Sequence, residues 1–498
     1  MSKQITLTPR SRILCASGSL IASALLVCTL GMAGCAQGTS SSADSAASST
    51  AAAHTVSSSD VVHATTSGKY LSKDDITINE TIENSADGEH AIAADGQNSS
   101  YANTLVKKTG ESSGDEADFY GENAAVFATN GATLDLSNMV VETNGTHANG
   151  VFSYGEGTTV NISDSVIETS GNCSGGLMTT GGGTMNASNL TIHTTGNSSA
   201  AIRSDRGGGT VTVTNGSYTT DGKGSPAIYS TADITVNDAL LTSTSSQGVV
   251  VEGKNSVTLN DVELVASNTS KNSDKSNYYQ AVMIYQSMSG DAANGEASFT
   301  ANGGSIANAN GDIFFVNNTV ATINLKNVAI TNSDASGVFL RAAAAGWGNE
   351  GSNGGQVTLK AQAQEINGNM LVDGVSNLNL YLADGSTFNG TINPDGSEGD
   401  VYVEISGGSK WVLTGDAYVK SLTCDADSID LNGHTLYVDG QAYEAGTAST
   451  GSAIAVVVSE SSHSGPGGDA PSGGAPSGGS SQGPGGSSGS TPPDKPKN

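Results

Sequence analysis

Positively charged side chains are scarce in this sequence. Its 498 residues include 20 Lys and Arg against 48 Asp and Glu, which gives a formal net charge of −28, and only 14% of the residues are charged. Proteins that bind nucleic acid, or an anionic membrane surface, need clustered basic residues. The composition therefore argues against nucleic acid as a partner and against membrane contact through a basic patch.

Proline is also rare in the part of the chain that has to fold. Only Pro226 and Pro394 lie between residues 60 and 460, and seven of the ten prolines lie at or beyond Pro466. Strong helix formers with charged side chains are few, whereas Ser, Thr, Asn, Gly and Val are common, which disfavours long surface helices. We therefore expect a β-rich, repetitive body in which the abundant glycines occupy turns.

The N-terminus has the pattern of a secretory signal: three basic residues among the first twelve, an apolar run and a small-residue site. The sequence Met32-Ala33-Gly34-Cys35 resembles a bacterial lipobox, which implies removal of residues 1–34 and attachment of a lipid to Cys35. A plain signal peptide with an incidental cysteine is the alternative. Lipidation would place the protein outside the cytoplasm, anchored to the bacterial cell membrane or cell surface through the lipid alone. The mature chain would have 17 basic and 48 acidic residues, a charge of −31.

Two low-complexity segments flank the predicted body. Residues 35–66 are mostly Ser, Ala, Thr and Gly, and we interpret them as a flexible tether. Residues 458–498 consist largely of Gly, Ser and Pro, and we interpret them as a disordered tail. Residues 67–457 remain as a single folded region.

Three short strand-like patterns recur through this region in a fixed order. The first series advances in steps of 26, 25, 26, 23 and 23 through Leu134, Val160, Met185, Val211, Ile234 and Val257. The second has the same steps through Val141, Ile167, Ile192, Tyr218, Leu241 and Leu264. The third advances in steps of 25, 26, 24, 26 and 22 through Phe127, Phe152, Met178, Ile202, Ile228 and Val250. Series that advance together predict one turn of a coil per repeat.

This coil length and the order of three strands resemble the right-handed parallel β-helix of pectate-lyase-like enzymes, bacterial adhesins and autotransporter passengers. The segment from Trp411 to Leu436 also resembles passenger-type coils. The resemblance implies an all-β solenoid with three short strands in each coil of 22 to 26 residues. Cys173 and Cys424 would then lie about ten coils, or roughly 50 Å, apart. A disulfide requires Cα atoms within about 7 Å, so the two should not pair.

Stacked acidic residues provide one candidate site. Glu142 and Glu168 occupy equivalent positions of successive coils and would bring two carboxylates close enough to share a metal ion. The resemblance implies Ca²⁺ as that ion, because polygalacturonate lyases of this fold bind calcium with stacked acids. The alternative is an ordinary solvated ladder that Lys107 and His193 neutralise.

A second candidate combines an arginine with an aromatic ring. Arg203 and Arg206 are two of only three arginines in the predicted mature chain. Arg203 is one coil before Tyr229, so a guanidinium and a ring could share one face, an arrangement suited to acidic sugars. Solvent-exposed turn charges are the simpler interpretation, and a catalytic base is a third.

Four insertions interrupt the coils, and long loops on a repetitive scaffold often carry binding surfaces. Two precede a third strand: residues 111–123, which are acidic, and residues 267–279, which end in Tyr278 and Tyr279. Two follow a third strand, residues 287–296 and 342–355, and should meet on one edge. They bring together Asp291, Glu296 and Trp347, an aromatic residue beside carboxylates that suits a pyranose ring. Alternatively, Trp347 packs beneath its own loop.

The sequence thus favours a lipid-anchored surface protein that acts as a non-catalytic adhesin or carbohydrate-binding module for a polysaccharide or a host or cell-surface glycan. A polysaccharide lyase or hydrolase of the same fold is the alternative, and a structural surface spacer is a third. No catalytic residues and no cofactor other than the Ca²⁺ above are predicted. The histidines lack zinc-site spacing, and Cys-x-x-Cys is absent.

Overall fold

The computed structural model describes residues 70–271, 273–276, 278–287, 289–396 and 399–456. The predicted signal peptide, Cys35, the tether and the tail lie outside these residues. The predicted body, residues 67–457, contains all of the described chain. Within the described chain, no helix is long and apolar enough to cross a membrane.

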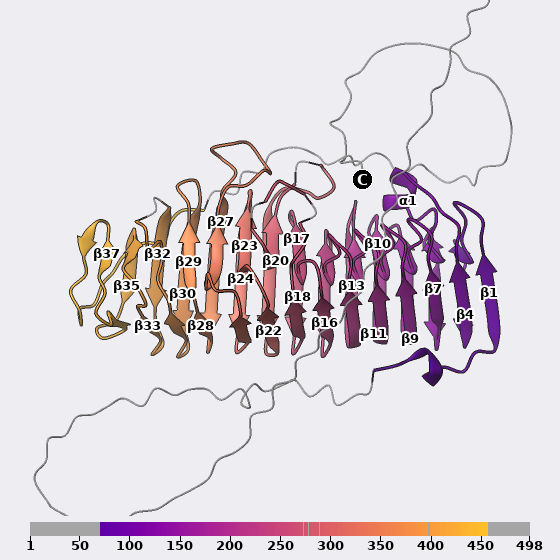
Figure 1. The fold of residues 1–498 in the computed structure, drawn as a ribbon, viewed down its shortest axis with the longest axis horizontal. Helices are drawn as coiled ribbons and strands as arrows, with labels where there is room; N and C mark the ends of the chain where they lie inside the picture. Colours follow the sequence, from indigo (N-terminus) through magenta and orange to yellow (C-terminus); the bar gives the residue numbers. More distant parts are fainter. Residues whose placement is uncertain (1–69, 272, 277, 288, 397–398, 457–498) are drawn as a thin grey trace, which may run out of the picture. The chain divides into compact units, whose positions relative to one another are not determined.

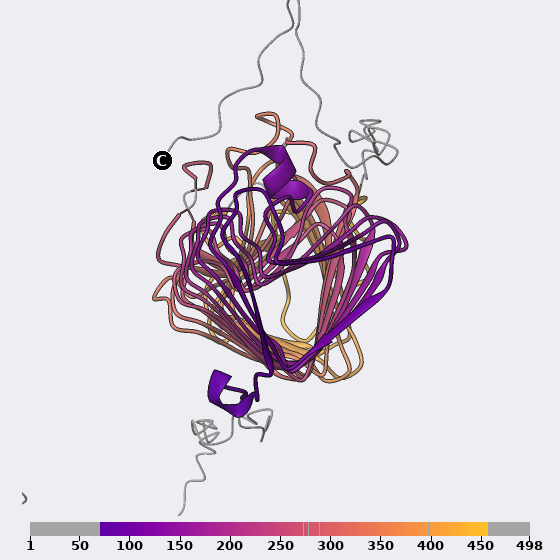
Figure 2. The ribbon, with the colours of Figure 1, turned by 90° about the vertical axis from the view of Figure 1, so that its right-hand side faces the viewer.

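The chain forms a parallel β-helix, which confirms the predicted fold class. Successive coils stack on one another, and equivalent strands of neighbouring coils pair in parallel (Figure 1). The described chain has only two short helical segments, the 3₁₀ helix η1 (Lys73–Asp75) and the helix α1 (Asp115–Phe119). Seen along the stack, α1 and several loops project from one side, and η1 lies on the opposite side (Figure 2).

The described strands form four sheets. The 20-stranded sheet contains β1 (Glu80–Asn84), β3 (Ser99–Ala102), β4 (Thr104–Lys108), β6 (Thr133–Ser137), β7 (Val140–Thr143), β9 (Thr159–Thr169), β11 (Gly183–Thr194), β13 (Gly209–Thr220), β15 (Asp233–Asn237), β16 (Leu240–Ser243), β18 (Ser256–Asn260), β19 (Glu263–Ala266), β21 (Glu296–Asn302), β22 (Ser305–Asn308), β24 (Thr319–Lys326), β25 (Ala329–Asn332), β27 (Gly355–Gln362), β30 (Asn377–Ala383), β32 (Asp400–Ile405) and β35 (Ser421–Cys424).

The 11-stranded sheet contains β2 (Ile92–Asp95), β5 (Val126–Thr129), β8 (Val151–Tyr154), β10 (Leu177–Thr180), β12 (Ile202–Ser204), β14 (Ile228–Ser230), β17 (Val249–Glu252), β20 (Gln280–Tyr285), β23 (Asp312–Asn317), β26 (Val338–Ala342) and β29 (Asn369–Val372). A 4-stranded sheet contains β28 (Glu365–Asn367), β31 (Thr387–Asn389), β33 (Lys410–Val412) and β36 (Ile429–Asp430). A 3-stranded sheet contains β34 (Ala417–Val419), β37 (Leu436–Val438) and β38 (Gln441–Ala442).

The first two predicted series are confirmed by the strand pairing, and both lie in the 20-stranded sheet. Leu134 pairs with Val160 and Val141 pairs with Ile167, and the later members follow in register. In β9 both predicted strands are continuous across a corner at Asp164, where φ is 50°. Asp and Asn tolerate this left-handed conformation better than most residues, which explains their recurrence at the corner.

The third predicted series is wrong as a single ladder, because it mixes two faces of the 11-stranded sheet. Phe152 and Met178 lie on the outer face, and the residue in register with them in the next coil is Arg203. Ile202, the predicted member, instead belongs to the central core with Ile228. We call the outer register position of this sheet the outer row: Phe127, Phe152, Met178, Arg203, Tyr229, Val250, Met283, Phe315 and Arg341.

Many glycines have a positive φ at the turns, as in Gly181 and Gly207, but others are needed for a second reason. Gly145, Gly171, Gly196 and Gly222 stack in successive coils, and none has a positive φ. A Cβ on Gly196 would lie 1.8 Å from the carbonyl oxygen of Gly171. This column therefore needs glycine because the backbones of neighbouring coils approach too closely for a side chain.

One continuous apolar core fills the described stack, from Ile92 to Leu436. Cys173 and Cys424 are not joined by a disulfide, as predicted. Stability therefore comes from burial of apolar side chains and from the hydrogen bonds between coils.

Candidate functional site

A cleft of about 430 Å³ lies over the outer face of β14, β17 and β20. Its lining includes the rings of Tyr229, Tyr278, Tyr285 and Trp347 together with the carboxylate of Glu252. Tyr278 comes from the insertion at 267–279 and Trp347 from the insertion at 342–355. The cleft thus forms where the predicted insertions meet the sheet.

The outer row explains why loops cover this part of the coil. Tyr229, Val250, Met283 and Phe315 are large apolar or aromatic residues, and a bare coil would expose them to water. They pack instead in a second hydrophobic cluster with residues of the insertions, including Trp347.

Contacts between aromatic rings fix the walls of the cleft. Trp347 packs edge-on against Tyr285 with ring centroids 5.1 Å apart. Tyr278 packs against Phe315 at 5.4 Å, and the guanidinium of Arg341 lies 4.0 Å from the centre of the Tyr278 ring. Because Trp347 and Tyr278 are both half-buried, each ring is supported on one side and accessible on the other.

Glu252 is the buried acid of the cleft, with only 1% of its surface exposed. One carboxylate oxygen, Oε2, accepts hydrogen bonds from the hydroxyls of Tyr285, at 2.8 Å, and Tyr229. Burial and the Glu252 charge raise the pKa of both tyrosines well above their usual value, so both phenols stay protonated and donate. The other oxygen, Oε1, is also buried and has no hydrogen-bond partner within the described chain.

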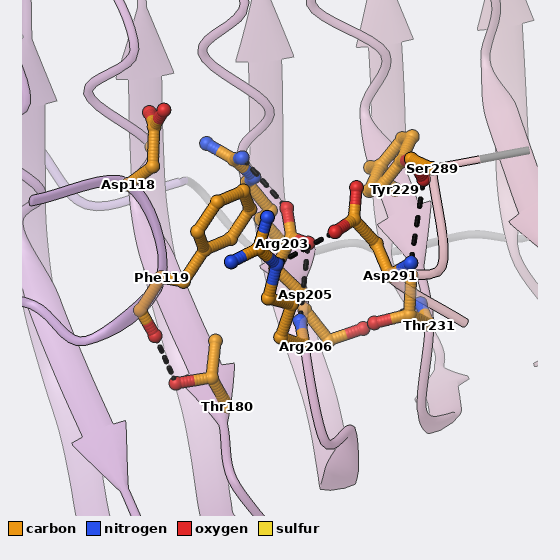
Figure 3. Close-up of polar contacts among 12 residues, drawn as sticks. Asp118, Phe119, Thr180, Arg203, Asp205, Arg206, Tyr229, Thr231, Ser289 and Asp291 are labelled. Carbon is orange, nitrogen blue, oxygen red and sulfur yellow. Dashed lines mark hydrogen bonds and ion pairs between the residues drawn. The ribbon is translucent and has the colours of Figure 1, made fainter. Parts of the chain in front are cut away.

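Asp291 lines the rim of the cleft and is held by Arg206. The Asp291 carboxylate lies 2.6 Å from Nε of Arg206 (Figure 3). Nη1 of the same arginine lies 3.0 Å from Asp115. The guanidinium also stacks on the ring of Phe119, 3.7 Å from its centre. Arg206 therefore connects the loop that carries Asp291 to α1.

Arg203 is in register with Tyr229, as the sequence predicted, but it does not line the cleft. Its Nη2 lies 2.7 Å from Asp205, and the guanidinium extends between Asp205 and Asp118 (Figure 3). Burial raises the pKa of Asp205 to about 6, although Arg203 opposes the shift, and the charges of Asp291 and Glu252 add to it. Arg203 is therefore a buried ion-pair partner instead of a surface guanidinium that stacks on a sugar.

Two other predicted residues lie outside the cleft. Tyr279, next to Tyr278 in sequence, does not line it, and the Lys271 ammonium lies 5.5 Å from the centre of its ring. Glu296 is exposed at the start of β21 and accepts a hydrogen bond from Thr322. The predicted meeting of insertions is thus seen for Trp347 and Asp291, which line the same cleft, but Glu296 is not part of it.

Glu142 and Glu168 are in register on neighbouring strands, as predicted for the calcium candidate. Lys73 of η1 bridges them, with Nζ 2.8 Å from each carboxylate. These two hydrogen bonds raise the pKa of Lys73 to about 12. The neutralising residue is therefore Lys73, because Lys107 pairs with Glu83 and His193 pairs with Asp221. A calcium ion at this position would have to displace the ammonium group.

The sequence reasoning missed Glu252, Tyr285 and Asp205. Each of the three follows a residue of the outer row by two positions: Glu252 and Tyr285 end β17 and β20, and Asp205 comes directly after β12. The alternation of inward and outward residues along Val249–Glu252 places Glu252 on the outer face with Val250, but the third predicted series mixes the two faces of the sheet. The sequence pattern that identifies these residues is therefore present, but it can be recognised only when the strands are aligned in the correct register.

The β-helix thus carries a cleft that is lined by four aromatic rings and by a buried, partly unsatisfied carboxylate. Comparison of the chain with protein-family models, with curated proteins and with solved structures finds no match.

Proposed function

We propose that this protein is a surface-located, lipid-anchored β-helix that binds a polysaccharide or a host or cell-surface glycan in the cleft of Tyr278 and Trp347. The observation that carries the proposal is the combination of half-buried aromatic rings with the unsatisfied Oε1 of Glu252. Flat rings provide apolar contact for the faces of a sugar, and a carboxylate accepts hydrogen bonds from its hydroxyls. The lipid anchor at Cys35 remains a prediction, since Cys35 lies outside the described residues.

Two lysines of the cleft provide partners for acidic groups of a glycan. Lys271 and Lys275 both line the cleft, in a chain that has few basic residues. The Lys275 ammonium lies 6.0 Å from the centre of the Trp347 ring. A sugar stacked on Trp347 would therefore bring a carboxylate or sulfate group within reach of a lysine, which supplies attraction and orientation.

Binding to an array of acidic and neutral polysaccharides, followed by calorimetry with the best ligand, tests this proposal. We expect Trp347→Ala and Tyr278→Ala to weaken binding by about tenfold or more, because each removes a ring that contacts the sugar. Tyr279→Ala is the matched control, since this neighbouring ring does not line the cleft. Unchanged affinity in Trp347→Ala and Tyr278→Ala would refute the proposal.

A polysaccharide hydrolase is a second candidate, supported by the proximity of three carboxyl groups. Burial raises the pKa of Asp205 to about 6, and Glu252 and Asp291 lie near enough to add to the shift. Pairs of carboxyl groups with different pKa values carry out acid–base cleavage of glycosidic bonds. Release of reducing ends from the bound polysaccharide, abolished in Glu252→Gln, would assign hydrolysis. Retained binding without release would assign a binding module.

A further inference from the structure

Three potential metal ligands meet beneath α1, outside the cleft. His147 and Cys173 occupy equivalent turn positions of successive coils, both with left-handed backbones, at φ 58° and 54°. The His147 amide donates a hydrogen bond to the carbonyl of Asn172, the residue before Cys173, at 2.9 Å. Neighbouring coils therefore place the imidazole and the thiol side by side, and Asp118 approaches them from α1.

The three side chains are close enough to share one ion. One donor atom from each of Asp118, His147 and Cys173 lies within 4.8 Å of the other two. Asp118 and His147 are each 8% exposed, and Cys173 is half-buried. Oδ1 of Asp118 lies 2.8 Å from Nδ1 of His147, yet this buried nitrogen makes no well-directed hydrogen bond within the described chain. The imidazole nitrogen therefore keeps a lone-pair direction that a cation can use.

The scaffold holds Asp118 in place. The hydroxyl of Thr180 donates a 2.7 Å hydrogen bond to the carbonyl of Phe119, and Arg206 stacks on the Phe119 ring (Figure 3). Arg206 also pairs with Asp115, at the first residue of α1. Ligands on supported elements lose little conformational freedom when an ion binds, which favours affinity.

The local charge balance also favours a cation. The surrounding charges are four carboxylates and two guanidinium groups, those of Asp115, Asp118, Asp205, Asp291, Arg203 and Arg206. With the carboxylates ionised, these groups leave an excess of two negative charges. Arg203 pairs with Asp205 at 2.7 Å, and the charge of Asp118 also acts on its guanidinium. A divalent ion at Asp118 would therefore compensate the excess.

We propose that Asp118, His147 and Cys173 form a binding site for Zn²⁺. Sulfur, imidazole nitrogen and carboxylate oxygen are the ligands that this ion takes, whereas Ca²⁺ and Mg²⁺ prefer oxygen alone. In a tetrahedral site the ligand atoms lie roughly 3.5 Å apart, so Asp118 and His147 separate slightly from their 2.8 Å contact while the three donor atoms gather around the ion. The Cys173 thiol loses its proton to solvent as the sulfur–zinc bond forms, and no electron is transferred.

Cobalt titration of the full chain tests the site, because Co²⁺ adopts similar coordination and absorbs light. Cys15, Cys28 and Cys35 are first replaced by serine, so that Cys173 and Cys424 are the only thiols left. We expect one Co²⁺ per chain, with a thiolate-to-cobalt charge-transfer band in the near ultraviolet. Zn²⁺ should displace the Co²⁺ and raise the Tm, since the ion binds the folded state.

Variants identify the ligands. Cys173→Ser should remove the charge-transfer band, whereas Cys424→Ser, the matched control, should keep it. His147→Asn should weaken binding by more than about tenfold while its backbone retains the left-handed conformation that asparagine tolerates. The absence of the band in the parent chain, or its persistence in Cys173→Ser, would overturn the proposal. Far-ultraviolet circular dichroism of each variant shows whether the β-helix is intact.

Discussion

The ion pair of Arg203 and Asp205 is a buried charge pair on a fold that is otherwise poor in charge. Asp205 is 4% exposed, and its carboxylate is paired with Nη2 of Arg203, while Nη1 has no hydrogen-bond partner within the described chain. Removing water from a carboxylate disfavours its ionised form, so the folded protein binds a proton at Asp205 more readily than the unfolded chain does.

This pKa shift predicts a pH dependence of stability. The folded-state pKa of about 6 exceeds the ordinary value of 3.8, so the stabilisation that protonation provides is complete below about pH 4 and is lost as the pH rises to 6. Asp205→Asn should remove this slope, and it should also lower the overall free energy of unfolding because Arg203 loses its partner. Urea denaturation at several pH values between 4 and 6 measures both effects. Asp135→Asn, at an exposed aspartate of β6, is the control. If the free energy of unfolding of Asp205→Asn changed with pH as steeply as that of the parent protein, Asp205 would not be the source of the pH dependence.

The sequence predicted the positions of residues that belong to the repeat better than those of residues outside it. The register of Arg203 with Tyr229 followed from coil spacing alone and is confirmed. Lys73 lies before the first coil, so no periodicity could bring it to Glu142. Tyr278 and Trp347 were recognised as insertion residues, but only the structure shows that the rings share a cleft, because loop conformation does not follow the coil period.

At the level of strands and turns, hydroxyl ladders satisfy the buried backbone of the coil. Ser174, Ser199 and Ser225 stack at the same turn, and each is completely buried. Oγ of Ser199 accepts a hydrogen bond from the amide of Ser174 at 2.9 Å and donates one to the carbonyl of Gly171 at 3.1 Å. These bonds connect neighbouring coils beside the glycine column.

Ser199→Ala should therefore lower the free energy of unfolding by about 1–3 kcal/mol. The substitution leaves a buried amide and a buried carbonyl without their partner, which costs more than the loss of one hydrogen bond at the surface. Chemical denaturation measures the change. Ser188→Ala, at an exposed position of β11, should stay within about 0.5 kcal/mol of the parent. Equal stability of the two variants would show that the ladder does not hold the coils together.

The inward face was predicted correctly for the strands of the first two series but not for those of the third, and the difference has a physical reason. The first two series lie on strands that are apolar inside and polar outside, so alternation identified the inward residues. The outer row is apolar over much of its length because insertions cover it, as at Phe152 and Met178. When both faces of a strand are buried, hydrophobicity no longer distinguishes them. β26 also contains a bulge between Val338 and Leu340 where it pairs with β29, an irregularity that an apolar spacing does not reveal.

On the scale of the whole described body, the C-terminal end of the stack is closed by a change of strand direction. β38 pairs antiparallel with β37, and Ser449 then pairs antiparallel with Cys424 on the last strand of the 20-stranded sheet. Further on, Ile454 exchanges two hydrogen bonds with the side chain of Asn379. The returning chain thus covers an edge that would otherwise pair with another molecule.

A chain that ends at residue 435 should therefore associate. It lacks β37, β38 and the returning segment, which exposes the edge of β35 and the apolar end of the core. Size-exclusion chromatography should show oligomers or aggregates. The control is a chain that ends at residue 456, which retains every described residue and should elute as a monomer. Identical elution and Tm for the two truncated chains would contradict a capping role.

The two ion pairs of Arg206 also limit where coils can be added to or removed from the stack. Arg206 contacts Asp115 on α1 and Asp291 on a loop that follows β20, which are separated by several coils. Each added or deleted coil between them would shift one contact by about 4.8 Å, which is farther than an ion pair can stretch. Duplication or loss of coils is therefore tolerated more easily outside the interval between α1 and this loop. Within that interval, Arg206 sets a fixed spacing between the proposed zinc site and the proposed glycan cleft.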